Sequence, residues 1–417
     1  VSGGKVFLSG NGIIGDAGLL DEPKAEKATE DVIAETDCIT SQISALDFTS
    51  TIGGPLKAII SKNFQSEEKK MTLAIVSELK RQANKIELEN LIFYKKLGFG
   101  QFGSVYLVKH PDFSDFMALK CVSKQKVMET ELEIHIRQEK QVMESVNFPF
   151  IVNLIRTFKD DHSVYFLEEY VKGMELFDVI RDMNLLNKAE SQYFIGSLLL
   201  CIEYLHSFNI VYRDLKPENI MVDHKGHVKL IDMGTAKFLK SKSHRTFTTI
   251  GTPHYMAPEV IIGKGYGLMA DLWSLGICLY EFMCGGLPYG ENAEDPQEVC
   301  EAILTQPIRF PSFVKDVSSR KIMCQLMNKV PELRLGNSYA ALKSNPWFDD
   351  FDWDALHVKE LKPPYIPPPK KLITEEEIEK MTAQGHKVID EIRKEQKSLP
   401  PYQKEKAKNK NWDDIFQ

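Results

Sequence analysis

The segment Val211–Ile220, followed by Asp232-Met-Gly234, limits most strongly what this chain can fold into. It sets a carboxylate, an ammonium group, a carboxamide and a second carboxylate in a fixed order, on Asp214, Lys216, Asn219 and Asp232. Phosphoryl transfer from ATP needs this set. One carboxylate orients the acceptor hydroxyl and takes its proton, the ammonium steadies the moving phosphate, and the amide and second carboxylate hold Mg²⁺. Any one of these residues is uninformative alone, but the ordered set predicts phosphoryl-transfer chemistry.

A glycine-rich turn precedes this segment, in the stretch Leu97-Gly-Phe-Gly-Gln-Phe-Gly-Ser-Val105. Glycines let a backbone approach phosphates closely, and Val105 would cover an adenine. Such a turn is weak by itself, because many glycine-rich hairpins are only turns. It gains weight from Lys120, which follows at strand spacing, and from Glu139, its expected partner in a helix predicted over 134–146. A lone Lys–Glu pair is more often a surface ion pair, but the order of all these segments favours an ATP site.

Composition is that of an ordinary globular protein, with 417 residues and 43% hydrophobic content, and the length predicts two or three domains. The net charge of −7 argues against a general nucleic-acid binder. The seven cysteines form no C-x-x-C pair, which is typical of a reducing, cytoplasmic setting. The most apolar stretch, 194–205, is too short to span a membrane. The chain begins with Val and shows no signal peptide, so we expect a fragment or a processed form of a longer protein.

Four segments are expected along the chain. Residues 1–61 contain short apolar runs broken by glycines, and 62–90 have the spacing of a helical linker. Residues 91–348 carry the motifs above. Residues 349–417 form a tail with an extended proline-rich stretch at 362–369, and then an amphipathic helix introduced by a capping box at Thr374. The lysine-rich run 404–410 is interpreted as a solvated tail rather than a localisation signal.

Residues 91–348 resemble the Ser/Thr protein kinases of the cyclic-nucleotide-dependent branch. Tyr212-Arg-Asp marks that branch, and Lys216 favours Ser/Thr over Tyr acceptors. Within it, the segments Gly251–Glu259 and Asn411–Phe416 look most like cGMP-dependent protein kinase. The resemblance implies an α+β, bilobal kinase fold, with a small β-rich lobe and a large helical lobe, that uses ATP and Mg²⁺. It also implies that the two aromatic residues near the C-terminus fold back onto the small lobe.

Residues 1–61 resemble the second half of a β-barrel cyclic-nucleotide-binding domain. In that family a glutamate grips the ribose and an arginine holds the cyclic phosphate. Here Asp16 replaces the first and Glu26 stands at the position of the second, and a carboxylate repels a phosphate. We therefore expect a degenerate partial domain, with cGMP acting through upstream domains that are not in this chain.

The resemblance also assigns roles to individual residues. It implies that Asp214 is the catalytic base, that Lys216 stabilises the transferred phosphate, and that Asn219 and Asp232 bind metal. ATP-binding positions are Leu97, Gly98, Phe99, Gly100, Gln101, Phe102, Gly103, Ser104, Val105, Lys120, Glu139 and the hinge residues Glu169 and Val171. The resemblance implies that Thr248 is the activating phosphosite, with Arg213, Lys237 and His135 around it. Protein substrates with basic residues before the acceptor would be bound by Glu175, Glu218 and Glu281. Glu259 is expected to pair with Arg334, and Asp271 is expected to accept amides of the catalytic loop.

Some positions depart from the family pattern and keep alternatives open. Glu168 stands before the hinge, where a non-acidic residue is usual, so it must either pair with Lys120 or be protonated. Met233 replaces a usual Phe, which should be tolerated, and the tail lacks the expected Phe-Asp-x-Tyr element. A pseudokinase or scaffold is therefore one alternative, although the complete catalytic set weighs against it. A cAMP-dependent-type catalytic subunit is the other, and the nucleotide-binding-like segment in cis disfavours it.

Overall fold

The computed structural model describes residues 85–369, 385–397 and 401–416. The chain divides into two compact units, Val1–Ala83 and Asn84–Gln417, and the described residues all belong to the second. The predicted barrel half at 1–61 and most of the predicted linker at 62–90 therefore lie outside the described residues.

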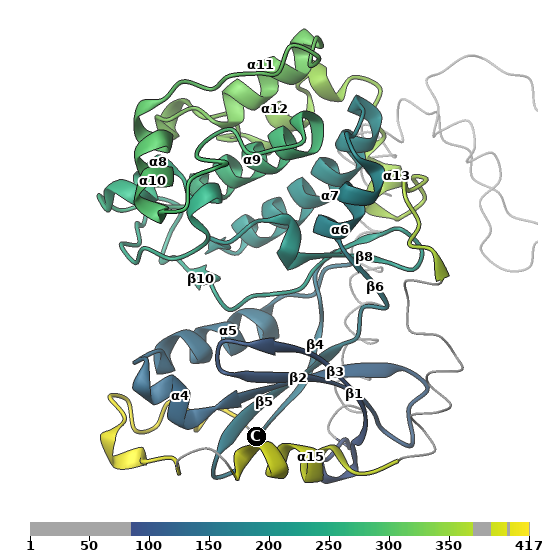
Figure 1. Cartoon of the computed structure of the whole chain (residues 1–417), viewed down its shortest axis with the longest axis vertical. Helices are drawn as coiled ribbons and strands as arrows, with labels where there is room; N and C mark the ends of the chain where they lie inside the picture. Colours follow the sequence, from purple (N-terminus) through teal and green to yellow (C-terminus); the bar gives the residue numbers. More distant parts are fainter. Residues whose placement is uncertain (1–84, 370–384, 398–400, 417) are drawn as a thin grey trace, which may run out of the picture. The chain divides into compact units, whose positions relative to one another are not determined.

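The first lobe of this unit is a five-stranded antiparallel sheet with the order β1-β2-β3-β5-β4. Its strands are β1 (Ile92–Gly100), β2 (Gly103–Lys109), β3 (Phe116–Ser123), β4 (Leu154–Lys159) and β5 (Ser163–Glu169). Exposure alternates along much of β2 and β3, because successive side chains of a strand point to opposite faces. Helix α5 (Glu133–Ser145) lies between the sheet and the helical lobe, and α4 (Lys124–Glu129) precedes it (Figure 1).

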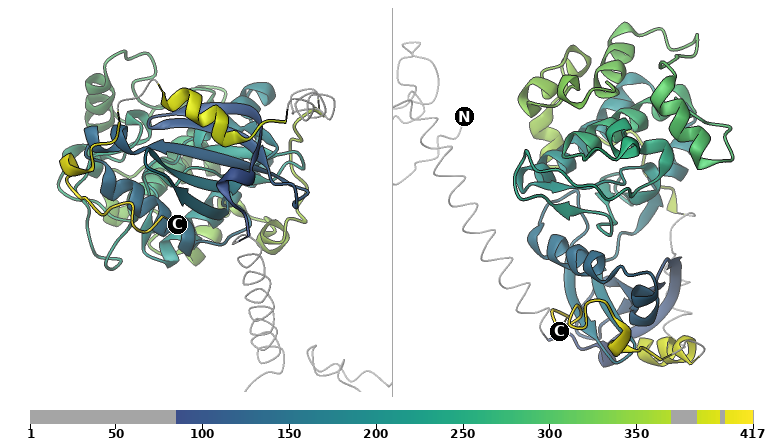
Figure 2. Two further views of the ribbon diagram at one scale, coloured as in Figure 1. Left: turned by 90° about the horizontal axis from the view of Figure 1, so that it is seen from below. Right: turned by 90° about the vertical axis from the view of Figure 1, so that its left-hand side faces the viewer.

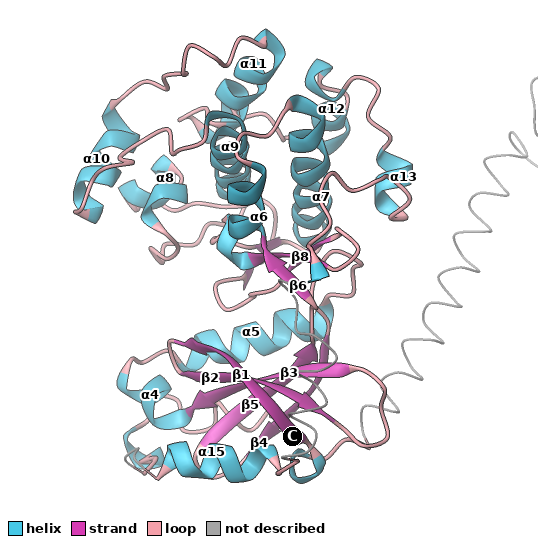
Figure 3. Cartoon of the chain, turned by 45° about the vertical axis from the view of Figure 1, so that its right-hand side comes forward, coloured by secondary structure: helices cyan, strands magenta, loops and turns pink. Residues whose placement is uncertain are grey.

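The second lobe is mostly helical. Its helices are α6 (Leu176–Met183), α7 (Lys188–Ser207), α8 (Pro258–Ile262), α9 (Met269–Cys284), α10 (Pro296–Thr305), α11 (Val317–Leu326), α12 (Tyr339–Lys343) and α13 (Trp353–His357). Helix α7 begins with a capping box between Asn187 and Glu190, which satisfies free amides of its first turn. Helices α7 and α9 are buried on nearly all sides and form the centre of the lobe (Figure 3).

Short strands and 3₁₀ turns at the end of the helical lobe that faces the sheet carry the catalytic segment (Figure 1). The strands are β6 (Gly173–Glu175), β7 (Ile210–Val211), β8 (Ile220–Asp223), β9 (Val228–Leu230) and β10 (Lys237–Phe238). The 3₁₀ turns of the described chain include η1 (Leu88–Asn90), η2 (Pro217–Asn219), η3 (Pro253–Tyr255), η4 (Pro331–Leu333), η5 (Pro346–Phe348) and η7 (Lys404–Lys406). Because β8 pairs with both β6 and β9, Asn219 and Asp232 are held at neighbouring strand ends. The predicted sheet lobe and helical lobe are confirmed.

Two segments of the C-terminal tail pack on the small lobe. Trp412 and Phe416 are fully buried, and the Phe416 ring meets Phe166 of β5 edge-on at 5.4 Å, which confirms the predicted docking of the C-terminal aromatics. Helix α15 (Val388–Gln396) lies across the outer face of the sheet, away from the helical lobe (Figure 2). Residues 378–384 of the predicted tail helix lie outside the described residues, but the predicted apolar positions Val388, Ile389 and Ile392 are buried in α15.

Candidate active site

Lys120 on β3 and Glu139 on α5 form the predicted ion pair. Their Nζ and Oε1 atoms are 2.6 Å apart, and Asp232 Oδ1 lies 3.7 Å from the same ammonium. Burial alone would lower the pKa of Lys120, but Glu139 and Asp232 raise it well above its usual value. Helix α5 starts one residue before the predicted 134 and ends one before 146. Lys120 is therefore a fixed positive charge between the two lobes.

Asp214 is held by hydrogen bonds to both carboxylate oxygens. Thr252 donates to Oδ1 from its amide at 3.0 Å and from its hydroxyl at 2.8 Å. Asn219 Nδ2 donates to Oδ2 at 2.8 Å, and Lys216 Nζ lies 2.9 Å from the same atom. Lys216 also donates to the Thr252 hydroxyl. The structure therefore brings Asp214, Lys216 and Asn219 together as predicted. It adds Thr252, which the motif Gly251-Thr-Pro contained but to which no role was assigned.

Asn219 and Asp232 are suited to a Mg²⁺ ion. The Asn219 amide nitrogen is occupied by Asp214, which leaves its carbonyl oxygen as the ligand atom. Asp232 is ionised, since Lys120 lowers the pKa of its carboxyl, with the Gly234 amide donating to Oδ1 at 2.8 Å. Among the described residues, no three His, Cys, Asp or Glu side chains cluster as a metal site. Mg²⁺ commonly binds one or two protein oxygens and completes its shell with phosphate and water, so these two residues fit the ion.

The glycine-rich hairpin joins β1 and β2, with Phe99 opposite Ser104 and Gly100 opposite Gly103. A Cβ added to Gly98 would meet no atom within 4 Å, so this part of the hairpin borders open space where a phosphate could approach. A Cβ on Gly103 would lie 2.3 Å from the Cys121 carbonyl oxygen. Gly103 is therefore required for packing against β3, a different reason from the predicted approach to phosphates.

The other predicted ATP positions fall into groups. Val105 pairs with Lys120 across β2 and β3 and shares its face of the sheet. The hydroxyl of the neighbouring Ser104 is on the opposite face and donates to Glu395 of α15 at 2.8 Å. At the hinge, Val171 is buried, and the Glu169 carboxylate is bound by Lys229 at 2.8 Å and by Asn153 at 3.1 Å. Exposed or partly exposed side chains on the hairpin are Leu97, Phe99, Gln101 and Phe102.

Asp271 anchors the catalytic loop as predicted. Its carboxylate accepts the amides of Tyr212 and Arg213, each at 2.8 Å. His206 Nε2 also lies 2.8 Å from Asp271, and the Tyr339 hydroxyl lies 2.5 Å from His206 Nδ1. Sequence reasoning missed these last two residues, because neither belongs to a recognised motif. The buried network fixes the backbone just before Asp214.

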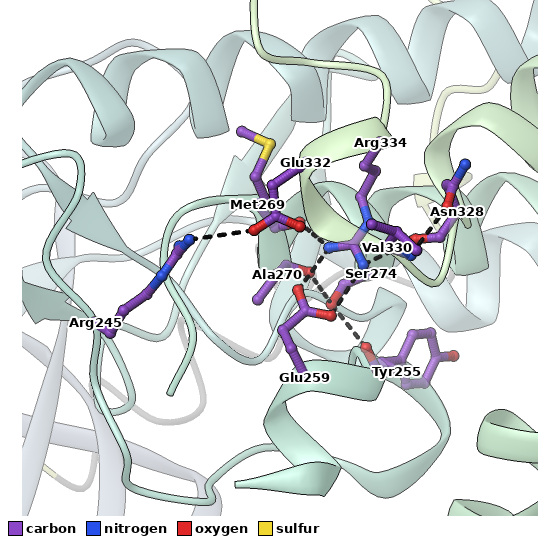
Figure 4. Close-up of polar contacts among 10 residues, drawn as sticks. All are labelled: Arg245, Tyr255, Glu259, Met269, Ala270, Ser274, Asn328, Val330, Glu332 and Arg334. Atoms are coloured by element: carbon purple, nitrogen blue, oxygen red, sulfur yellow. Dashed lines mark hydrogen bonds and ion pairs between the residues drawn. The ribbon is translucent and has the colours of Figure 1, made fainter. Parts of the chain in front are cut away.

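The predicted pair between Glu259 and Arg334 is bidentate, with Nη1–Oε1 at 2.7 Å and Nη2–Oε2 at 3.0 Å (Figure 4). The Arg334 side chain is fully buried, and it also donates to the carbonyl oxygens of Met269 and Asn328. This pair ties the segment after Asp232 to the end of the domain.

The three cations predicted around Thr248 lie close together. Burial lowers the pKa of His135, with Arg213 and Lys237 adding to the effect, and burial together with Arg213 lowers the pKa of Lys237. Both terminal nitrogens of Arg213 are buried and lack a hydrogen-bond partner among the described residues. Lys237 donates to the buried Thr246 hydroxyl at 3.1 Å, while Thr248 is exposed. Arg213 and Lys237 therefore place an excess of positive charge beside the segment that contains Thr248, while the lowered pKa of His135 keeps its ring neutral at pH 7.

The three acidic residues predicted to bind substrate influence one another. Burial, with Asp178 and Glu218, raises the pKa of Glu175. Burial raises the pKa of Glu281 to about 7. The Tyr255 hydroxyl, which donates a hydrogen bond to Glu281 at 2.6 Å, opposes this rise, whereas the negative charge of Glu218 increases it. Glu218 Oε2 is buried without a hydrogen-bond partner in the described residues. Carboxylates gathered in this way are suited to cationic side chains.

Glu168 does not capture Lys120. It pairs with Ala118 across β3 and β5, on the face that carries Lys120, but the described residues contain no ion pair to it. Burial raises its pKa to about 8, although Lys120 opposes the rise. Of the two alternatives from the sequence, the structure supports a protonated Glu168 at neutral pH.

Replacing Glu168 by Thr is expected to lower the KM for ATP only slightly at pH 7, and about threefold or more at pH 9. The carboxyl is neutral below its pKa and ionises as the pH rises through about 8, which puts a negative charge behind the adenine. Steady-state kinetics of parent and variant between pH 6.5 and 9 measure this effect. Equal KM values throughout would show that Glu168 has no influence on nucleotide binding.

Comparison with known proteins agrees with this geometry. Residues 91–348 match the protein kinase domain family, and the chain belongs to that family. It is 46% identical over 300 residues to a cGMP-dependent protein kinase of Toxoplasma gondii, covering 71% of this chain and 30% of the relative. It is 41% identical over 363 residues to that of Plasmodium berghei, covering 86% of this chain and 40% of the relative. The resemblance to cGMP-dependent protein kinases is confirmed.

A human cAMP-dependent protein kinase catalytic subunit is 38% identical over 275 residues, covering 65% of this chain and 75% of the relative. Of the two cGMP-dependent relatives, by contrast, the chain spans only 30% and 40% of the length. None of the described helices is long and apolar enough to cross a membrane.

Proposed function

We propose that this chain transfers the γ-phosphate of ATP to Ser or Thr hydroxyls of protein substrates, as the catalytic part of a cGMP-dependent protein kinase. The observation that carries the proposal is the joint presence of the Lys120–Glu139 pair at 2.6 Å and of an Asp214 carboxylate that accepts three hydrogen bonds and pairs with Lys216. A pseudokinase has no chemical need for either arrangement. Transfer of labelled phosphate from ATP to a basic peptide tests the proposal.

Each side chain has a distinct part in this chemistry. Lys120 binds phosphate oxygens and holds them in register with the acceptor. Asn219 and Asp232 would hold Mg²⁺, which when bound neutralises phosphate charge. Asp214 orients the substrate hydroxyl and accepts its proton, with Thr252 and Asn219 fixing the carboxylate plane. Lys216, 2.9 Å from Asp214, is the cation that stabilises the phosphate as it is transferred.

Thr248 is proposed as the activating phosphosite. A phosphate there would add about −1.5 to −2 charge next to Arg213, Lys237 and His135. Both terminal nitrogens of Arg213 and the Nδ1 atom of His135 are buried without a hydrogen-bond partner among the described residues. Replacing Thr248 by Ala is expected to lower activity about tenfold. Thr249→Ala, an exposed neighbour, is the matched control. Mass spectrometry that finds Thr248 unmodified in fully active protein would argue against this role.

The substrates are proposed to carry Arg or Lys shortly before the acceptor, facing Glu175, Glu218 and Glu281. Peptide arrays should show this preference, and Glu218→Gln should weaken it about tenfold through loss of a charge-assisted pair. Because the pKa of Glu281 is about 7, its ionised fraction increases from pH 6 to 8. The KM for a basic peptide is therefore expected to fall over that range. An acidic or proline-directed preference would contradict the assignment.

Regulation by cGMP is proposed to come from domains outside this chain, because the cGMP-dependent relatives are more than twice as long as the matched region. The cysteines of the described residues are all free, which suits a reducing compartment such as the cytoplasm. No observation on the described residues favours nucleic acid as a partner.

A further inference from the structure

The outer face of the glycine-rich hairpin is in contact with the tail helix α15. The hairpin strands bring Lys96 on β1 and Ser104 on β2 to this face. Glu395, in the last turn of α15, contacts both strands. Its Oε1 atom accepts from Lys96 Nζ at 3.0 Å, and its Oε2 atom accepts from Ser104 Oγ at 2.8 Å. One carboxylate therefore bridges the two strands of the hairpin.

The tip of the hairpin is exposed at residues 97–101, whereas β2 packs closely on β3 at Gly103. A cavity of about 250 Å³ lies between the hairpin and α15, lined by hairpin residues together with Ile392 and Glu395 of α15. Gly98 has no neighbour within 4 Å of the position of a Cβ, and the Phe99 side chain is 69% exposed. A glycine-rich hairpin above a cavity gains little from apolar contacts, so its polar contacts to Glu395 have a large share in fixing its position.

The rest of α15 is firmly attached to the sheet. Val388, Ile389 and Ile392 are buried against the outer face, and Gln396 donates to Ser163 of β5 at 3.1 Å. Glu395 is therefore presented from a fixed support. Burial alone would raise the pKa of Glu395, but side-chain hydrogen bonds from Lys96, Ser104 and Tyr106 lower it below its usual value, so the carboxylate is charged at neutral pH.

We propose that Glu395 is a positioning residue that acts through Ser104 and Lys96 to hold the hairpin over the ATP phosphates. This role rests on the proposed kinase function, because it assumes that the opposite face of the hairpin binds ATP. It predicts that loss of Glu395 weakens ATP binding more than it slows the chemical step.

The test compares Glu395→Ala, Ser104→Ala and the double variant with the parent chain. Either single change should raise the KM for ATP roughly three- to tenfold, with kcat within about twofold. The double variant should be no worse than the worse single one, because both remove the same contact. Glu391→Ala is the matched control, since Glu391 lies on the same helix but contacts His386 and Lys394 instead. Its KM should stay at the parent value.

Hydrogen–deuterium exchange of residues 98–105 gives a second readout that needs no ATP. Faster exchange in Glu395→Ala, but not in Glu391→Ala, supports the proposal. Unchanged KM and exchange in Glu395→Ala would overturn it, and so would equal effects of Glu391→Ala. If the parent itself transfers no phosphate, the proposed function fails, while the exchange data still decide whether Glu395 holds the hairpin.

Discussion

Replacing Lys120 by Met lowers phosphate transfer by about a hundredfold or more, because this ammonium places the ATP phosphates. Lys120 lies between Glu139 at 2.6 Å and Asp232 at 3.7 Å. Methionine has a similar length but offers no charge to a phosphate. The two carboxylates would then repel both each other and the nucleotide. Steady-state kinetics with a basic peptide measure the loss.

The fold should stay intact, which circular dichroism checks, because no apolar core residue is lost. The melting temperature should fall, since Lys120→Met leaves the buried Glu139 carboxylate without its ion-pair partner. Lys95→Met, on the exposed side of β1, is the matched control and should retain full activity. Transfer by Lys120→Met at the parent rate would mean that Lys120 does not position ATP.

Replacing Arg334 by Met is expected to destabilise the domain by about 3–5 kcal/mol, because it leaves Glu259 as a buried charge without its partner. The change also removes the donors to the carbonyls of Met269 and Asn328 (Figure 4). For a domain of this size the melting temperature should fall by roughly 6–15 °C.

Arg245→Met provides the comparison, since its pair with Glu332 is 3.6 Å long and exposed. Exposed pairs contribute about 0–1 kcal/mol, so its melting temperature should hardly change. The double variant Arg334→Met with Glu259→Met removes the unpaired carboxylate, and its melting temperature should lie between those of Arg334→Met and the parent. Equal melting temperatures for Arg334→Met and Arg245→Met would show that the buried pair is not a main source of stability.

Much of the site could be predicted because its catalytic residues lie close together in short segments of the sequence. Asp214, Lys216 and Asn219 lie within six positions, so their order alone indicates their use. Glu139 is farther away in the sequence, and the predicted helix and the order of the segments were needed to name it, while the resemblance to a known family placed Arg334. The bilobal fold followed from the same resemblance.

Side-chain direction and remote partners could not be predicted in the same way. Ser104 was grouped with the ATP-binding residues because it lies in the glycine-rich motif, yet strand alternation turns its hydroxyl to the other face. Its partner Glu395 is 291 positions away, and no local pattern connects the two. The protonation of Glu168 was left open by the sequence, since burial and distance from Lys120 decide it.

The central claim is that this chain is a phosphotransferase whose base is Asp214. The most direct test is labelled phosphate transfer from ATP to a basic peptide by the parent and by Asp214→Asn, with ATP affinity measured by calorimetry. We expect transfer to fall roughly a hundred- to ten-thousandfold, while ATP affinity stays within about twofold. Equal transfer by both proteins, or no transfer by a parent that binds ATP, would contradict the claim.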